Sequence, residues 1–103
     1  MGKTTIASAA FVACLCAPAA AQQDARELGY IVGTADVCGH DFDAARVARV
    51  VVDTLSKLGP ESRNTYELAT TGRKYRMRQM GDVERATACA IQLENARRYG
   101  LVD

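Results

Sequence analysis

The chain has 103 residues, of which 49% are apolar, with no Trp, two Phe and two Pro. This composition excludes a collagen-like or strongly disordered chain and is typical of a helical domain rich in Ala and Val. A chain of this length buries roughly two-thirds of the surface that its unfolded form exposes, so we expect one small domain without a large enclosed active site. These limits disfavour most enzymes.

The first residues have the three-part pattern of a secretory signal peptide. Lys3 precedes an apolar stretch over residues 6–15, and a run of three alanines ends at Ala21. The apolar stretch has about ten residues, half of what a membrane-spanning helix needs. We therefore expect cleavage after Ala21, which divides the chain into a signal peptide over 1–21 and a helical domain over 22–103 with a periplasmic or secreted location.

A bacterial lipoprotein box is the alternative interpretation of this region. It would end at Cys14, whose side chain would then carry a lipid. Phe11 is atypical at the first position of such a box, so we disfavour a lipid anchor at Cys14 and expect contact with the membrane only during export.

Export also changes the charge of the chain. Lys3 is one of 13 basic residues and is lost with the signal, which leaves as many bases as acids and a net charge of zero. Because phosphate neutralisation dominates the affinity of proteins for nucleic acid, this balance disfavours a nucleic-acid partner.

Two of the four cysteines, Cys38 and Cys89, lie beyond the signal. In an oxidising compartment two lone cysteines most simply form one disulfide. A catalytic redox pair is more often C-x-x-C, and a zinc site needs two further ligands, whereas the chain has a single His. We therefore predict a structural disulfide between Cys38 and Cys89, no metal site and no cofactor.

Apolar residues at helical spacing over residues 24–38 predict the first helix. Gly29 and Gly33 stand one turn apart on its flank, and each glycine costs roughly 1 kcal/mol of helix propensity. Two explanations for them are open. We favour the close approach of a neighbouring helix over a surface that meets a partner.

A turn over residues 39–43 follows, in which Asp41 or Asp43 is expected to cap the second helix. That helix is predicted to end at Leu58, because Gly59 and Pro60 stop it. Its expected buried stripe consists of Ala44, Val47, Val50, Val51, Thr54, Leu55 and Leu58. The opposite side is expected to carry Arg46, Arg49, Asp53 and Lys57.

A third helix is predicted from Pro60 or Ser62 to Met80, with a kink or break near Gly72. Asp82 is expected to cap a fourth helix, which Gly100 ends. The buried stripe of the fourth helix is predicted to consist of Val83, Ala86, Cys89, Ala90, Leu93 and Ala96. The sequence thus predicts an all-α fold, a small bundle of about four helices stapled by one disulfide.

Arg73, Lys74, Tyr75, Arg76 and Arg78 form the densest charge cluster of the chain. Because successive residues of a helix are turned by ~100°, these side chains spread around much of it. A solvated face is the favoured interpretation of the cluster, and a binding site for an anionic partner is the alternative.

His40 is the single imidazole and stands in the turn between Gly39 and Asp41, where we expect a surface loop residue rather than a general base. The usual nucleophile, zinc and phosphate-loop motifs do not occur in the sequence. Asp41 and Asp43 lack the further oxygen ligands of a calcium loop. We therefore expect a protein that is not an enzyme and acts by binding.

Residues 28–36 read LGYIVGTAD and are followed by Cys38, and residues 48–55 read ARVVVDTL shortly before Pro60 and Glu61. This pattern resembles the Tai/Rap group of small exported immunity proteins over roughly the first half of the mature chain. The chain departs from that group by lacking a cysteine just before the Gly-Tyr-Ile stretch and by its basic segment near Tyr75. The resemblance implies a helical, disulfide-bearing protein that neutralises a peptidoglycan-cleaving toxin delivered by type VI secretion.

Cys38 followed by Asp41 and Phe42 carries a fainter resemblance, to HdeA-type periplasmic acid-stress chaperones. Those proteins also pair one disulfide across their helices, and the resemblance implies a fold that opens in acid. We thus predict an exported binding protein of the immunity or inhibitor kind, with a periplasmic acid-stress chaperone as the alternative.

Overall fold

The computed structural model describes residues 22–103, and within that range the chain forms four helices and no strand. A helix over residues 22–38, called the N-terminal helix below, is followed by α2 (Ala44–Leu58), α3 (Glu61–Arg78) and α4 (Asp82–Arg98). The predicted all-α fold is therefore confirmed. The predicted signal peptide and the lipid anchor considered at Cys14 lie outside the described residues.

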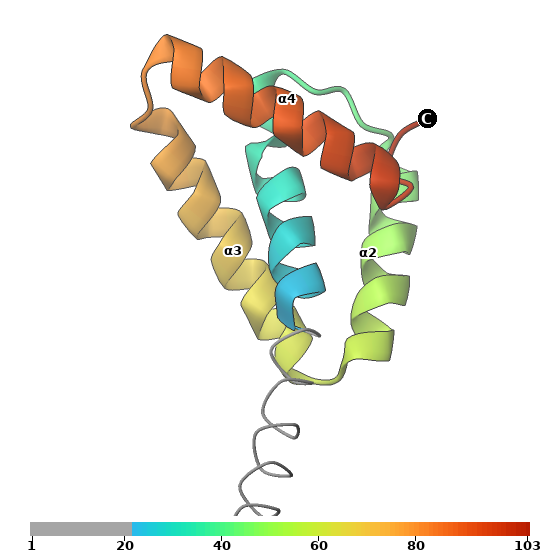
Figure 1. The fold of residues 1–103 in the computed structure, drawn as a ribbon. Coiled ribbons are helices and arrows are strands. Elements are labelled where there is room, and N and C mark those ends of the chain that lie inside the picture. The colour runs from blue at the N-terminus through green and yellow to red at the C-terminus, as the bar shows by residue number, and fades with distance from the viewer. Residues whose placement is uncertain (1–21) are drawn as a thin grey trace, which may run out of the picture.

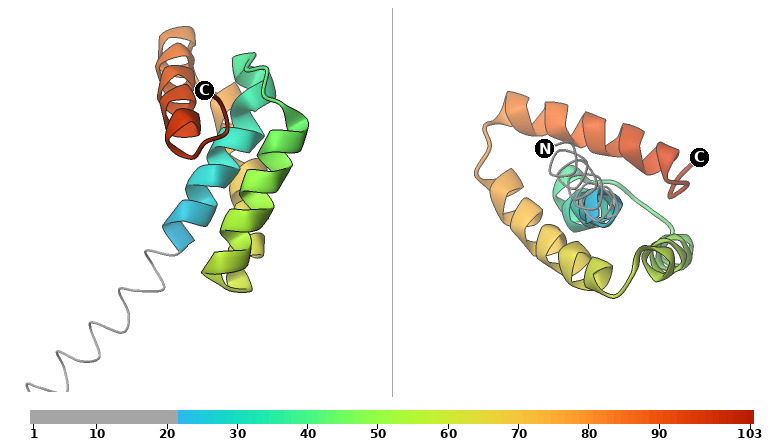
Figure 2. Two further views of the ribbon diagram at one scale, coloured as in Figure 1. Left: turned by 90° about the vertical axis from the view of Figure 1, so that its right-hand side faces the viewer. Right: turned by 60° about the horizontal axis from the view of Figure 1, so that its bottom comes forward.

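The N-terminal helix is the centre of the bundle. It lies between α2 and α3, and α4 lies across it (Figure 1). Viewed nearly along its axis, it is surrounded by the other three helices (Figure 2, right). Ala25, Leu28 and Ile31 on this helix are fully buried, and Leu28 and Ile31 pack with Val51 of α2 and Ala96 of α4. Their three-residue spacing places them on one face, in keeping with the helical spacing of apolar residues over 24–38.

Gly29 and Gly33 let the N-terminal helix and α3 approach each other at backbone distance. A Cβ atom on Gly29 would lie 2.6 Å from the carbonyl oxygen of Tyr66, and one on Gly33 would lie 2.8 Å from Cα of Thr70. Real side chains do not fit at such distances. The close approach of a neighbouring helix is therefore confirmed, and it leaves no room for a partner at either glycine.

The predicted start and end signals of α2 and the end signal of α4 are confirmed. Asp43 caps α2, since its carboxylate accepts a hydrogen bond from the backbone nitrogen of Ala45 at 3.2 Å. Gly59 ends α2 with a φ of 102°, and Gly100 ends α4 with a φ of 78°. Leu101 after it is buried and donates its backbone N–H to Ala96 O at 2.9 Å. This pattern of a positive-φ glycine and a buried apolar follower is a common helix end.

Two expectations about α2 are wrong. Ala44 is exposed, because it occupies the first turn beside the cap rather than the face that meets the core. Arg46 is not on a solvated side. Its Nε donates to Gly100 O at 2.9 Å, and its Nη1 lies 3.0 Å from the carboxylate of Asp103. The arginine thereby holds the end of the chain against α2.

The predicted break in α3 is also wrong, since the helix continues through Gly72 from Glu61 to Arg78. The hydroxyls of Thr70 and Thr71 donate to carbonyl oxygens one turn earlier, Tyr66 O at 2.8 Å and Glu67 O at 3.4 Å. Such bonds let a threonine fit inside a helix. Packing against the N-terminal helix therefore outweighs the poor propensity of these residues.

The register predicted for α4 is partly wrong. Its buried residues are Ala88, Gln92 and Ala96, whereas Val83 is 82% exposed and Ala86 and Ala90 are also exposed. The predicted stripe was chosen from apolar residues alone. It differs from the face that meets the bundle, because that face includes the polar side chain of Gln92.

Asp82 does not cap α4, because Gly81 holds the cap position and Asp82 lies inside the first turn. There an acid still suits the positive end of the helix dipole.

The predicted disulfide between Cys38 and Cys89 is confirmed, with the two Cα atoms 5.5 Å apart. It joins the end of the N-terminal helix to the middle of α4. Since α4 meets the bundle mainly through two alanines and a glutamine, this covalent link is its strongest attachment.

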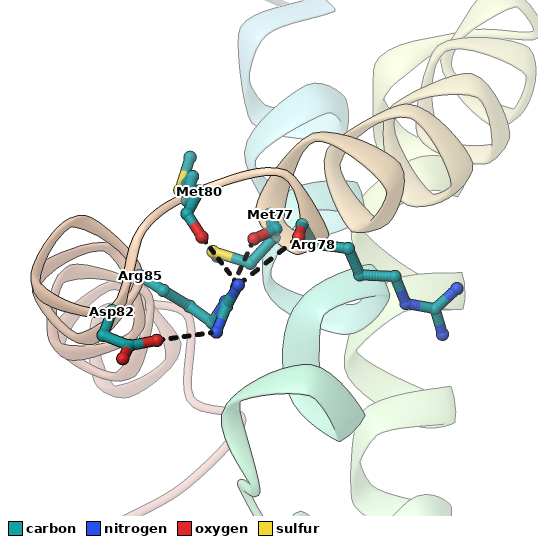
Figure 3. Close-up of polar contacts among 5 residues, drawn as sticks. All are labelled: Met77, Arg78, Met80, Asp82 and Arg85. Atoms are coloured by element: carbon teal, nitrogen blue, oxygen red, sulfur yellow. Dashed lines mark hydrogen bonds and ion pairs between the residues drawn. The ribbon is translucent and has the colours of Figure 1, made fainter.

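Arg85 closes the C-terminal end of α3 from the first turn of α4 (Figure 3). Its Nε donates to Met77 O at 3.1 Å, and its Nη2 donates to Met80 O at 2.6 Å and to Arg78 O at 3.3 Å. Its Nη1 lies 3.6 Å from a carboxylate oxygen of Asp82. The last carbonyls of a helix have no partner within it, and a cation suits the negative end of the helix dipole.

We expect Arg85→Met to lower the free energy of unfolding by about 2 kcal/mol, because three carbonyl oxygens lose a charged donor. Arg97→Met is the matched control, because Arg97 makes only a surface pair with Glu94 at 3.3 Å. That control should change the free energy by less than about 0.5 kcal/mol. Urea unfolding followed by circular dichroism measures both variants, and equal losses would contradict the role assigned to Arg85.

Candidate functional site

A groove of about 410 Å³ runs between the N-terminal helix and α3. On α3 its residues recur every three or four positions and so share one face, while those of the N-terminal helix stand one turn apart. Three of its eight lining residues are arginines, and none is acidic. We call it the arginine groove, and it is lined by Arg26, Tyr30, Thr65, Leu68, Ala69, Gly72, Arg73 and Arg76.

Arg73 is the most constrained cation of the groove. Its guanidinium carbon lies 5.3 Å from the centroid of the Tyr30 ring, within the range of a cation–π contact. Its Nε is buried and has no hydrogen-bond partner among the residues that the structure describes. A buried donor without a partner costs about 1–3 kcal/mol. Within residues 22–103, the free protein therefore holds a positively charged donor that no acceptor satisfies.

The rest of the groove combines open space with apolar surface. A Cβ atom on Gly72 would meet no atom within 4 Å, so the floor of the groove is open there. Leu68 at its edge is 68% exposed. Arg26 and Arg76 are exposed as well. The groove thus offers positive charge beside a bare apolar side chain.

The basic cluster predicted from the sequence is divided by the structure. Arg73 and Arg76 lie together in the arginine groove. Lys74 faces another flank, where its Nζ lies 2.8 Å from a carboxylate oxygen of Asp36. Tyr75 is 69% exposed and Arg78 is exposed, and neither lines the groove.

Sequence reasoning missed the contribution of the N-terminal helix to this site. Arg26 joins Arg73 and Arg76 only because Gly29 and Gly33 bring the two helices together. The sequence did contain a signal for Arg26, because this residue stands about one turn before Gly29 on the same helix. Residues one turn apart on a helix lie beside the same helix–helix contact.

His40 lies in the loop before α2, as predicted, but its ring is half-buried and its centroid is 5.5 Å from that of Phe42. With Asp36, Asp41 and Lys74 it lines a second cleft, of about 630 Å³, between the N-terminal helix, α2 and α3. Its Nδ1 is buried without a hydrogen-bond partner in the described part of the chain. Burial lowers the pKa of His40 below its ordinary 6.5, because the apolar surroundings disfavour the charged ring.

This lowered pKa predicts a pH dependence of stability. The unfolded chain takes up a proton on His40 near pH 6.5, and the folded chain does so only at lower pH. The neutral, buried ring therefore contributes its full stability above about pH 6.5. That contribution is lost as the pH falls from 6.5 toward the folded-state pKa. We expect urea unfolding to show a steeper loss between about pH 8 and 5 in the wild type than in His40→Gln. Equal slopes would contradict the assigned burial. Asp36, Asp41 and Lys74 line the same cleft and are the same residues in both proteins, so the comparison isolates the His40 ring.

The described residues contain no group of three or more His, Cys, Asp or Glu side chains placed to hold a metal ion. Every helix within residues 22–103 is too short or too polar to cross a membrane. No protein-family model, curated protein or solved structure matches this chain. The arginine groove is therefore the feature of the molecule from which we infer a function.

Proposed function

We propose that this chain is an exported helical binding protein that acts without catalysis, as an inhibitor or immunity protein that holds a partner protein at the arginine groove. The observation that carries the proposal is the buried Nε of Arg73, a charged donor without a partner beside an open groove floor. Pairing such a group on binding removes an energetic cost that the free protein bears. The sequence resemblance to exported immunity proteins supports the same class of function.

The neighbouring surface of α3 fits a protein partner. Leu68 and Tyr75 stand two turns apart and are both largely exposed, and Arg76 follows directly. Aromatic residues and arginine are enriched where proteins meet, and arginine and tyrosine often contribute most of the binding energy. This combination supports contact with a protein surface over contact with a simple ion.

A survival assay tests the proposal in the bacterium that encodes the chain. We expect a strain without the gene to be killed in contact with its parent, because the parent delivers the partner toxin. Wild-type protein should restore survival, and the double variant Arg26→Gln/Arg76→Gln should not. The double variant Arg49→Gln/Arg63→Gln is the matched control, since it removes two exposed arginines outside the groove. Survival of the deletion strain without the gene would refute the immunity proposal.

The acid-stress chaperone remains the alternative prediction, and acid titration tests it. The hydrogen bond from Lys74 holds the pKa of Asp36 below its ordinary 3.8, so its contribution to stability is present above about pH 3.8 and is lost as the pH falls through the folded-state pKa. Because exposed ion pairs contribute little, we expect the near-ultraviolet circular dichroism to persist to about pH 3. Its reversible loss between about pH 4 and 2, with capture of a denatured client protein, would favour the chaperone instead.

A further inference from the structure

We infer that the arginine groove binds one carboxylate of the partner protein, with an apolar neighbour of that acidic residue lying on Leu68. This inference rests on the proposed function, because a partner that is a protein presents carboxylates as its ordinary anions. It adds to that proposal the chemistry of the group that is recognised and the place where it is bound.

The planar guanidinium of Arg73 favours a carboxylate. A guanidinium is a rigid planar fork of N–H donors that matches the two oxygens of a carboxylate. The guanidinium carbon of Arg73 lies 5.3 Å from the centroid of the Tyr30 ring, so a cation–π contact holds the group beside the groove. One donor on the edge of this fork, Nε, has no partner. A carboxylate seated on that edge would satisfy it together with the neighbouring Nη group.

The groove has room for the small shift that this contact needs. Nε is buried in the free protein, so the side chain of Arg73 must move toward the groove to reach a ligand. The open floor above Gly72, one residue earlier on α3, supplies that space. No acidic side chain lines the arginine groove itself, although Arg73 also lines a separate cleft that contains Glu84.

Arg26 and Arg76 strengthen the attraction from the two walls. One stands on the N-terminal helix and the other on α3, and neither makes an ion pair within the described part of the chain. Their positive charges raise the local concentration of an anionic group and orient it toward Arg73.

Leu68 explains why the ligand should be more than a free anion. It is 68% exposed at the edge of the same groove, which Tyr30 also lines. An acidic residue flanked by a leucine-like side chain would cover this surface while its carboxylate reaches the arginines. Inorganic phosphate cannot make the second contact.

Nuclear magnetic resonance of the intact mature protein tests the inference at the atom concerned. The probes are two blocked tripeptides, acetyl-Leu-Glu-Leu-amide and acetyl-Leu-Gln-Leu-amide, with sodium phosphate as a third. We expect the Nε–Hε signal of Arg73 to shift with the Glu peptide, and the Glu peptide to bind roughly fivefold or more tightly than either the Gln peptide or phosphate. Arg76→Gln should weaken Glu-peptide binding, and Arg49→Gln should not.

Three results would overturn the inference: an unmoved Arg73 signal, equal binding of the two peptides, or tighter binding of phosphate. The proposed function fails separately. If the groove arginines are needed for survival but the Glu peptide does not bind, only the carboxylate inference falls. If the Glu peptide binds but Arg26→Gln/Arg76→Gln protects the cells fully, the proposed function falls.

Discussion

Reduction of the Cys38–Cys89 disulfide is expected to lower the free energy of unfolding by about 4 kcal/mol, because a link across 51 positions restricts the unfolded chain strongly. For a domain of this size that is a large part of the total stability. Urea unfolding with and without a phosphine reductant measures the loss, and Cys38→Ala/Cys89→Ala should reproduce it without reductant. Unchanged unfolding in the reduced protein would contradict this account.

We expect α4 to be the first helix to unfold in the reduced protein. Its buried residues are Ala88, Gln92 and Ala96, which offer little apolar area. Two further attachments are polar: Arg85 at the end of α3, and the hydroxyl of Tyr99, which lies 2.7 Å from a carboxylate oxygen of Glu27. Burial and this carboxylate raise the pKa of the Tyr99 hydroxyl, so it stays protonated. We expect amide hydrogens of α4 to exchange fastest after reduction, ahead of those in the N-terminal helix.

Gly33→Ala is expected to lower the free energy of unfolding by about 3 kcal/mol, since overpacking of this kind forces the backbone to shift. The added Cβ would lie 2.8 Å from Cα of Thr70 and closer still to its carbonyl oxygen, and a backbone cannot turn aside as a side chain can. The N-terminal helix and α3 would have to separate along their whole contact.

Gly72→Ala is the matched control for this prediction. It makes the same chemical change in α3, the other helix of this contact, but its Cβ would meet no atom within 4 Å. We expect a gain of up to about 1 kcal/mol, because alanine is the better helix former. Thermal unfolding of the two variants measures both changes in stability. A loss of equal size in both would contradict the prediction, because the effect of Gly33→Ala would then not come from the close helix contact.

Features that depend on neighbouring residues in the chain could be predicted from the sequence. Asp43, Gly59 and Gly100 mark helix ends through local backbone chemistry, and the structure confirms all three. Gly29 and Gly33 pointed to a close helix contact because a costly residue type recurs at one-turn spacing. The disulfide followed from the count of cysteines beyond the predicted signal.

Features that depend on how the helices lie against one another could not be predicted. α4 buries Gln92 and exposes Val83 because it lies across the N-terminal helix, and no periodicity in its own sequence encodes that angle. The role of Arg85 depends on the end of a different helix, and that of Arg26 on α3. The sequence therefore indicated Arg73 and Arg76 of the arginine groove but not Arg26.

The most direct test of the account is the survival of the deletion strain when it is complemented with the groove variant. The account predicts that Arg26→Gln/Arg76→Gln is exported and folded like the wild type but fails to protect, while Arg49→Gln/Arg63→Gln protects fully. Full protection by Arg26→Gln/Arg76→Gln at equal protein levels would contradict it, because the partner would then be held elsewhere on the molecule.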